Sequence, residues 1–494
     1  MDAGRGRAAP FHVWTPTIVT SIALHLPAQE VGNLRFVDQA ASVTLQERIH
    51  VFVDRPLSRP SFLTGADSFV AQWSAPSACK PLTLAQKRQL LALGAIGTVA
   101  TLDVACRATG LQPSAEDLEA AAGAGAIDCC RKIYGALQRA LTHDRTEALK
   151  AALYAAARGG QREACEWCLA RIAASLRGPE ACVAAAGAAR GGHERLASWL
   201  LERAEGNGPS RFSYTQGLDF WLAGCSLELC RPGVDGAAAR RGHLICLSAL
   251  EGCSLDGVER LLQQAQGGPP GPKAFAMGDA VDRAVSSPTP DWEAKVRWAL
   301  AQGGRLRATS YTAVVANVHD PKELLKRLSY LEDHGCRPDS YALDTAVAAG
   351  KLAAVEWLIG CHGSGAARVR PSALCCRESM HAAAKAGHLD VLKALHSAGC
   401  VLPPHELAQA AASGGRLEVL QWAWAALGEE EKAKTAPVFA AAAGADRNNV
   451  EAMRWLVAQG CCLSEKAWAA AEDSGCEPAL ELLEELRCPK PQQR

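Results

Sequence analysis

The chain repeats one phrase of amino acids along most of its length. The phrase reads AAAKAGHLDVLKALHSAGC at 382–400, AVAAGKLAAVEWLIG at 346–360 and AAASGGRLEVLQWAW at 410–424. An earlier copy reads AAARGGQREACEWCL at 155–169. Each copy has an alanine-rich half, a central glycine and an amphipathic half. Self-similarity of this kind is typical of repeat architectures, so we expect stacked copies of one unit rather than a single central core.

The tryptophans give the period of the repeat. Six of the 12 tryptophans occupy one position of the phrase: Trp167, Trp199, Trp298, Trp357, Trp422 and Trp455. Trp167 and Trp199 are 32 residues apart, Trp422 and Trp455 are 33 apart, and Trp199 and Trp298 are 99 apart, which is three times 33. The intervals after residue 330 vary around this value, so the repeat is close to 33 residues with loops of variable length.

One unit reads as two short helices joined by a tight turn. Ala382–Ala386 predicts a thin first helix, and Leu389, Leu392 and Leu395 form an apolar stripe on a second one. Gly387 lies between them, where a backbone with positive φ favours glycine. Helices this short cannot bury their apolar faces alone, so the units must stack. We therefore predict an all-α fold, a helical solenoid.

The unit resembles an ankyrin repeat, which is about 33 residues long and contains a helix–turn–helix. The matching residues are Ala382, Ala383, Gly387, His388, Leu389, Val391, Leu392 and Leu395. Segments such as SSPTPDWEAKVRWAL (286–300) resemble divergent ankyrin arrays of green algae. The resemblance covers roughly 85–488 and implies about 10–12 repeats that bind a partner protein. Of the ankyrin T-P-L-H tetrapeptide, at most Met380-His381 matches this chain, so the sequence leaves two alternatives for the family's β-hairpin fingers, hairpins or simple loops.

Bulk properties exclude several classes of function. The chain carries 52 basic and 52 acidic residues, and this zero net charge argues against nucleic-acid binding as its main role. No apolar run approaches the length of a membrane-spanning helix. The start of the chain does not match the pattern of a secretory signal peptide, and a plastid or mitochondrial leader is kept as an alternative. We expect an intracellular protein of the cytoplasm or nucleus, without membrane partners.

The 20 cysteines suggest a disulfide or metal framework, but their placement favours another interpretation. Cys336, Cys400 and Cys461 each follow a glycine after a second helix. Cys165 and Cys168 form a CxxC inside a helical phrase, with no second pair at zinc-finger spacing. We therefore expect free, buried thiols in a reducing compartment and no cofactor or metal.

Residues 1–80 do not follow the repeat. Residues 14–37 resemble an F-box, the adaptor-binding segment of ubiquitin-ligase substrate receptors, and the matching positions occur in the family's order. They are Pro16, Ile22, Leu26, Pro27, Val31, Leu34, Arg35 and Val37. The resemblance implies that Pro16, Ile22, Leu26, Pro27, Val31, Leu34 and Val37 would contact an adaptor. The alternative is an N-terminal helical cap, because a solenoid must cover its first apolar face.

No phosphate-binding loop, nucleophile elbow or zinc helix is present, so no enzyme is expected. His193, His243 and His388 each follow a glycine and are interpreted as turn residues. The better candidate is a basic ladder of Arg158, Arg190, Arg240 and Lys385, each two residues before a turn glycine. In ankyrin arrays this position faces the concave side, which implies a surface for an acidic partner.

We divide the chain into an F-box-like or capping region (1–80), the repeat array (81–488) and a polar tail (489–494). Residues 204–216, 264–273 and 362–373 predict projecting loops. Two phrasings compete between 218 and 262, with the turn either at AAARRGH (237–243) or within ALEGCSLDGVERLL (249–262). The leading hypothesis is a protein-binding scaffold, and the alternative is an F-box substrate receptor. A cysteine-based redox or metal enzyme is the third class considered.

Overall fold

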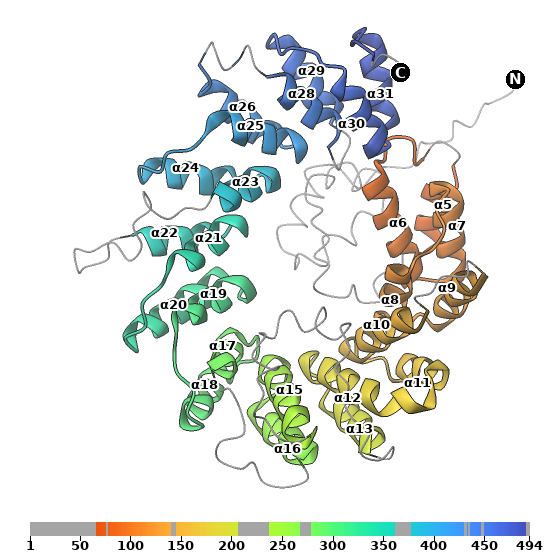
Figure 1. The fold of residues 1–494 in the computed structure, drawn as a ribbon, viewed down its shortest axis with the longest axis vertical. Helices are drawn as coiled ribbons and strands as arrows, with labels where there is room; N and C mark the ends of the chain where they lie inside the picture. The colour runs from red at the N-terminus through yellow and green to blue at the C-terminus, as the bar shows by residue number, and fades with distance from the viewer. Residues whose placement is uncertain are drawn as a thin grey trace, which may run out of the picture. The chain divides into compact units, whose positions relative to one another are not determined.

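The computed structural model of the chain describes residues 66–75, 78–139, 145–205, 237–266, 278–360, 377–428, 432, 435–445 and 449–490. These residues form 25 helices and no strand, which confirms the all-α prediction (Figure 1). The F-box-like segment lies outside the described residues, as do most of the three predicted loops. Within the described ranges, no helix is both long and apolar enough to cross a membrane.

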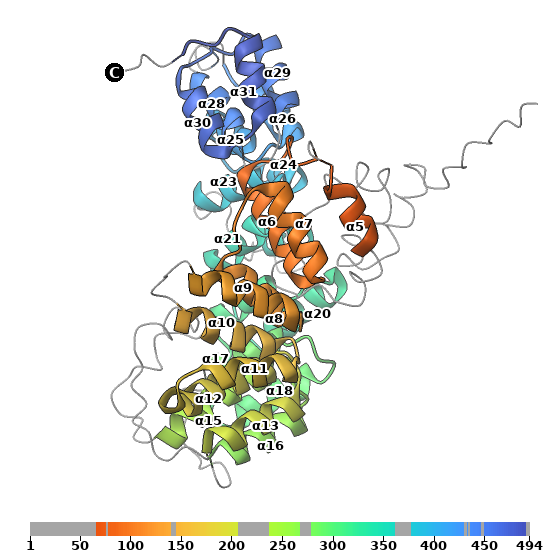
Figure 2. The same cartoon turned by 90° about the vertical axis from the view of Figure 1, so that its right-hand side faces the viewer.

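The chain divides into two compact units, which we describe separately. The first comprises residues 1–79 and 90–168, and the second comprises residues 80–89 and 169–494. The first unit contains α5 (Ala66–Trp73), α7 (Val99–Thr109), α8 (Ala115–Gly123), α9 (Ile127–Arg139) and α10 (Arg145–Arg158). Helices α6 (Leu84–Ile96) and α11 (Arg162–Arg171) each span a boundary between the units. In the first unit α8 packs on α9 and α10, and α7 packs on α5 and α9 (Figure 2).

The described part of the second unit consists of antiparallel helix pairs. Their first helices are α12 (Ala174–Arg190), α15 (Ala237–Gly252), α17 (Gly278–Ser286), α19 (Ala308–Asn317), α21 (Ser340–Ala348), α23 (Arg377–Ala386), α25 (Pro404–Ser413), α28 (Ala436–Ala443) and α30 (Lys466–Ser474). Their second helices are α13 (Glu194–Glu205), α16 (Leu255–Gln266), α18 (Trp292–Ala301), α20 (Pro321–Asp333), α22 (Leu352–Ile359), α24 (Leu389–Ser397), α26 (Leu417–Ala425), α29 (Val450–Ala458) and α31 (Glu477–Glu485).

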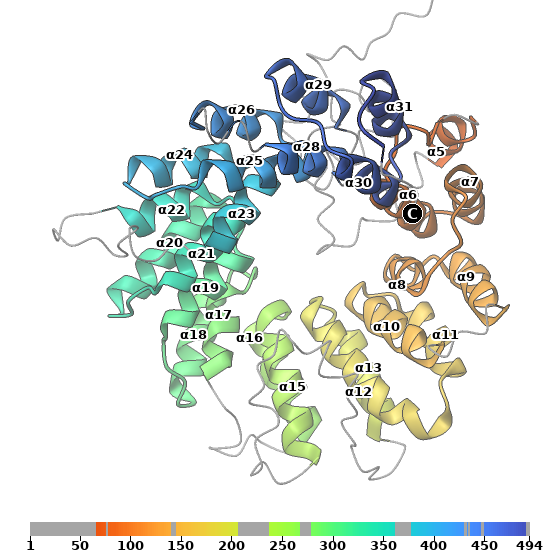
Figure 3. The same cartoon turned by 45° about the horizontal axis from the view of Figure 1, so that its top comes forward.

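The pairs pack side by side within this unit. Each first helix contacts the first helix of the next pair, from α12 to α30, and several second helices contact in the same order (Figure 3). The first helices form one row and the second helices another, with the first-helix row on the inner side of the unit's own curve (Figure 1). The apolar core therefore runs between the two rows.

Composition explains the two kinds of helix. The first helices bury alanine, as at Ala346 on α21 and Ala410 and Ala411 on α25, each with no exposed surface. Alanine has the highest helix propensity and lets neighbouring backbones approach closely. The second helices bury stripes such as Val391, Leu392 and Leu395, so larger side chains fill the space between the rows.

Two kinds of glycine shape the turns. Gly387 has a φ of 92°, a left-handed conformation that confirms the predicted positive φ. Gly414 has an ordinary φ, but a Cβ built on it would lie 1.9 Å from the carbonyl oxygen of Lys385 in the preceding pair. A Cβ on Gly252 would lie 2.2 Å from the carbonyl oxygen of Arg190. Glycine is thus needed at these positions because the next backbone occupies the place of a side chain.

The structure decides between the two phrasings of 218–262. Residues 237–252 form one helix, α15, and the turn follows at residues 253–254. His243 is therefore buried inside a helix, and its interpretation as a turn residue is wrong. Arg240 lies in the first turn of α15 rather than at its end. Glu251, the residue before Gly252 at the end of α15, occupies the same position of the repeat as Arg190 at the end of α12.

Most of the described cysteines are buried, as predicted. Fifteen are free thiols, and 12 of these are buried: Cys79, Cys129, Cys130, Cys165, Cys168, Cys182, Cys246, Cys253, Cys400, Cys461, Cys476 and Cys488. Cys462 is exposed. Most of these thiols fill positions in the apolar core.

Candidate functional site

The residues of the predicted basic ladder have different surroundings. Arg158 ends α10 in the first unit, whereas Arg190, Arg240 and Lys385 belong to the second. Arg190 and Lys385 end α12 and α23, and Lys385 is exposed. The side chain of Arg240 lies outside the described part, as do the adaptor-contact residues predicted for the F-box.

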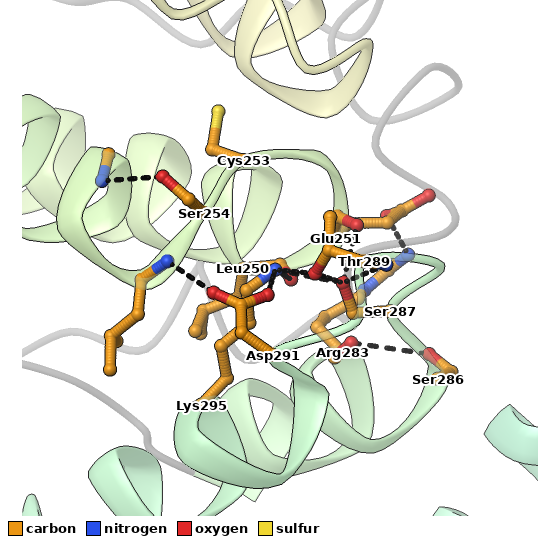
Figure 4. Close-up of polar contacts among 12 residues, drawn as sticks. Leu250, Glu251, Cys253, Ser254, Arg283, Ser286, Ser287, Thr289, Asp291 and Lys295 are labelled. Atoms are coloured by element: carbon orange, nitrogen blue, oxygen red, sulfur yellow. Dashed lines mark hydrogen bonds and ion pairs between the residues drawn. The ribbon is translucent and has the colours of Figure 1, made fainter.

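Arg190 belongs to an ion-pair network rather than to a basic strip. Its Nε donates to Glu251 Oε1 over 2.7 Å, and Arg283 Nη1 donates to the other oxygen of Glu251 over 2.8 Å. The three side chains come from α12, α15 and α17, so one carboxylate joins three consecutive first helices. Figure 4 shows the contact between Arg283 and Glu251. The negative charge of Glu251 interrupts the predicted ladder.

Further polar contacts join neighbouring first helices. Arg307, just before α19, donates to Asp279 and Asp282 on α17 over 2.9 and 2.8 Å. Ser379 on α23 donates to Asp344 on α21 over 2.9 Å. Side chains of both charge signs therefore lie along this row, so its described residues do not form a purely basic surface.

A buried lysine forms the most concentrated polar cluster. Lys295 on α18 has no exposed surface, and its Nζ donates to Leu250 O over 3.0 Å, Ser287 Oγ over 2.9 Å and Thr289 Oγ1 over 2.6 Å. Asp291 Oδ1 lies 3.8 Å from the same nitrogen. Figure 4 shows these groups around the turn between α17 and α18, against the end of α15. All three ammonium hydrogens thus have acceptors.

The electrostatics of the cluster follow from its burial. Burial lowers the pKa of Lys295, and the nearby charge of Asp291 opposes that change. For Asp291, burial is the largest single effect and acts to raise the pKa. Hydrogen bonds from Thr289 and from the Leu255 N–H, together with the charge of Lys295, outweigh burial, so the pKa of Asp291 is lowered. The lowered pKa of Asp291 favours its carboxylate, whereas burial disfavours the ammonium of Lys295. The three acceptors and the nearby carboxylate are the groups that stabilise the charged form of Lys295 in this turn.

A second buried cation lies in the next pair. Arg327 on α20 is 4 % exposed, and its Nη1 donates to Val285 O over 2.9 Å and Ser287 O over 2.7 Å. Its guanidinium lies over the ring of Trp292, 4.8 Å from the centroid, and Glu323 Oε2 is 3.7 Å from its Nε. The planar cation thus bonds the end of α17 and stacks on a buried indole.

A third cation repeats the arrangement. Lys351 precedes α22, and its Nζ donates to the carbonyl oxygens of Val315, Ala316 and Val318 at the end of α19. Burial lowers the pKa of Lys351 to about 8, whereas three carbonyl acceptors favour the ammonium.

These groups include residue types used in catalysis, but their bonding indicates a structural role. The hydrogen-bond donors of Lys295 are occupied by the fold. Burial, with a contribution from Glu194, raises the pKa of the Cys253 thiol to about 12, which suppresses the nucleophilic thiolate. In the described ranges, no three His, Cys, Asp or Glu side chains are grouped to hold a metal. The arrangement is suited to joining helices.

The sequence did carry a signal for these cations. Lys295 lies between Trp292 and Val296 at the spacing of the buried stripe of α18. Arg327 occupies the same place among Leu324, Leu328 and Leu331 on α20. A charged residue within an apolar stripe indicates a buried polar contact, and the sequence interpretation missed it because it counted only apolar positions.

No protein-family model matches this chain, and no curated protein matches it.

Proposed function

We propose that the chain is a non-catalytic scaffold, a divergent ankyrin-like solenoid that binds a partner protein on its concave face and loops. The observation that carries this proposal is the side-by-side contact of successive first helices through the second unit, which makes one extended row on the inner side of the unit's curve (Figure 1). The buried Lys295 and Arg327 and the half-buried charged groups described above bond the fold itself. Recognition would therefore be spread over many weak contacts rather than concentrated in one pocket.

Exposed residues on the first-helix row are the partner contacts that we propose. Tyr341, in the first turn of α21, is 71 % exposed, an unusual state for a large aromatic side chain. His381 and Lys385 on the next first helix, α23, are also exposed. Tyrosine combines a large contact area with a hydroxyl group, and it is enriched in protein interfaces. These neighbouring helices are where we expect a partner to bind.

The test is affinity capture with the full chain from its own cells, followed by quantitative mass spectrometry. The variant Tyr341→Ala with Lys385→Glu is compared with Lys393→Glu, which reverses an exposed charge on the second-helix row. We expect the first variant to lose a specific protein at least tenfold and the control to retain it. Equal retention by both variants, or capture of no specific protein by the wild type, would contradict the proposal.

The F-box hypothesis is the alternative, and it is supported by the ordered match of Pro16, Leu26, Pro27 and Val31 in the sequence. In that case the N-terminal segment binds a ubiquitin-ligase adaptor and the repeats select the target. Leu26→Ala combined with Val31→Ala should then abolish recovery of the adaptor while leaving other captured proteins unchanged. Failure of the wild type to recover an adaptor would favour the capping role.

A further inference from the structure

The first helices of the second unit have a common problem at their C-terminal ends. The last four carbonyl groups of any α-helix lack partners within that helix. At three of these helix ends the carbonyls belong to fully buried residues, Leu250, Val285 and Val315. Buried carbonyls without donors are costly, which makes the source of their hydrogen bonds informative.

At three consecutive junctions the donor is a cation from the following pair. Lys295 bonds the end of α15 from 45 residues away, and Arg327 bonds the end of α17 from 42 residues away. Lys351 bonds the end of α19 from 36 residues away. The donor in every case belongs to the pair that begins after the helix it completes.

Because each cation donates to carbonyls of the preceding pair, those carbonyls have this donor only while the following pair is in place. If the pair α19–α20 opens, Arg327 leaves two buried carbonyls at the end of α17. If the pair α17–α18 separates from α15–α16, Lys295 leaves Leu250 O without this donor, whereas its bonds to Ser287 and Thr289 lie within its own pair. An unpaired buried polar group costs the full desolvation penalty, so opening at one junction weakens the adjacent one.

We infer that Lys295, Arg327 and Lys351 lock the four pairs from α15 to α22 into one cooperative block that opens as a whole. Two junctions further along the unit use other donors at the same place. Arg416 Nε lies 3.4 Å from Lys385 O, and Asn449 Nδ2 donates to Ala412 O over 3.0 Å. The block is a conformational device of the fold and does not depend on the identity of any partner.

Hydrogen exchange of the full chain, read by mass spectrometry under native conditions and in low denaturant, tests this inference. In the wild type, we expect peptides from α15 to α22 to reach one common opening free energy as denaturant increases. Distinct opening free energies for the four pairs would overturn the inference, and this result needs no variant.

The variant Arg327→Met sharpens the test. It keeps an unbranched chain but removes the donors to Val285 O and Ser287 O. We expect exchange to rise at least tenfold throughout α15–α22, including α16 and α22, which Arg327 does not bond. A rise confined to α17 and α20 would contradict the inference.

Two controls match this variant. Lys322→Met removes an exposed cation from the same helix, α20, and should leave exchange unchanged. Asn449→Ala removes a neutral donor outside the block and should raise exchange only in α25 and α28. If Asn449→Ala raised exchange across the entire second unit, cooperativity would belong to the whole array and the block would be wrong.

Discussion

Two groups of junctions in the second unit join similar helix pairs by different means. Where α15 meets α12 and where α25 meets α23, a glycine lets one backbone lie directly on the carbonyl of the preceding helix, at Arg190 and Lys385. From α15 to α21, the joining groups are the long side chains of Lys295, Arg327 and Lys351. The first helices α17 and α19 are followed by Ser287 and Val318 rather than by glycine.

The difference shows that one repeated fold can join neighbouring first helices in two ways. Glycine brings backbones into contact and needs no donor side chain, but it tolerates no added atom. A buried cation reaches the carbonyls from a distance, but it must be bonded fully to offset its desolvation. The first solution is sensitive to volume, and the second is sensitive to the loss of a charge or a hydrogen bond.

The largest expected effect concerns the buried aromatic side chains of the second helices, which both groups of junctions have. Trp357 on α22 and Trp424 on α26 are 7 % and 5 % exposed, and each lies against another aromatic ring, Tyr311 or Trp455. Trp357→Ala and Trp424→Ala should each lower the free energy of unfolding by about 3–5 kcal/mol. Chemical denaturation measures both. A small effect of Trp357→Ala alone would mean that the cations, rather than the core, stabilise the middle pairs.

Gly414→Ala tests the glycine junction. The added Cβ would lie 1.9 Å from the backbone oxygen of Lys385, so α25 must move away from α23. We expect a loss of about 1–3 kcal/mol, measured by thermal or chemical unfolding. Gly135→Ala on α9, where nothing lies within 4 Å of the new atom, should instead stabilise its helix by about 0.5–1 kcal/mol. Equal effects of the two changes would refute close backbone contact as the reason for Gly414.

The first unit contains an acid, Glu119, whose surroundings disfavour its charged form. Burial and the neighbouring Glu116 raise the pKa of Glu119 on α8 to about 7, and Arg158 opposes this rise. Because the folded pKa lies above the ordinary value of 4.5, the wild type is favoured below pH 4.5 and loses stability as pH rises through 7.

Glu119→Gln removes that titration. With allowance for the solvent-exposed part of the side chain, we expect the variant to be about 1–2 kcal/mol more stable at pH 8 and similar to wild type near pH 4.5. Unfolding curves across this range measure the difference. A constant difference at every pH would show that packing, rather than charge, distinguishes glutamate from glutamine here.

The repeated phrase predicted much of this architecture from the sequence. The alanine halves, the stripe of Leu389, Leu392 and Leu395 and the positive φ of Gly387 appear as expected because each depends on residues a few positions apart. The interpretation of His243 and the position of Arg240 were wrong because ARRGH imitates a turn inside a helix that tertiary packing extends to Gly252.

The candidate surface was less predictable. The phrase placed Arg190 and Lys385 at the ends of first helices, and the structure has them there. The sequence could not indicate that Glu251 bonds both Arg190 and Arg283, because its partners are 61 and 32 residues away. The two possible phrasings of 218–262 also concealed the correspondence of Glu251 with Arg190, because Arg240 lies 11 residues before Glu251.

The sequence by itself determined that this chain forms short paired helices with small residues on one helix and larger apolar residues on the other. Those properties follow from local periodicity and turn chemistry, which act within one phrase. Only the tertiary structure decided which charges are buried and what they bond. A hydrogen bond from Lys295 to Leu250, 45 residues away, exists only after neighbouring pairs have stacked and excluded water from the helix end.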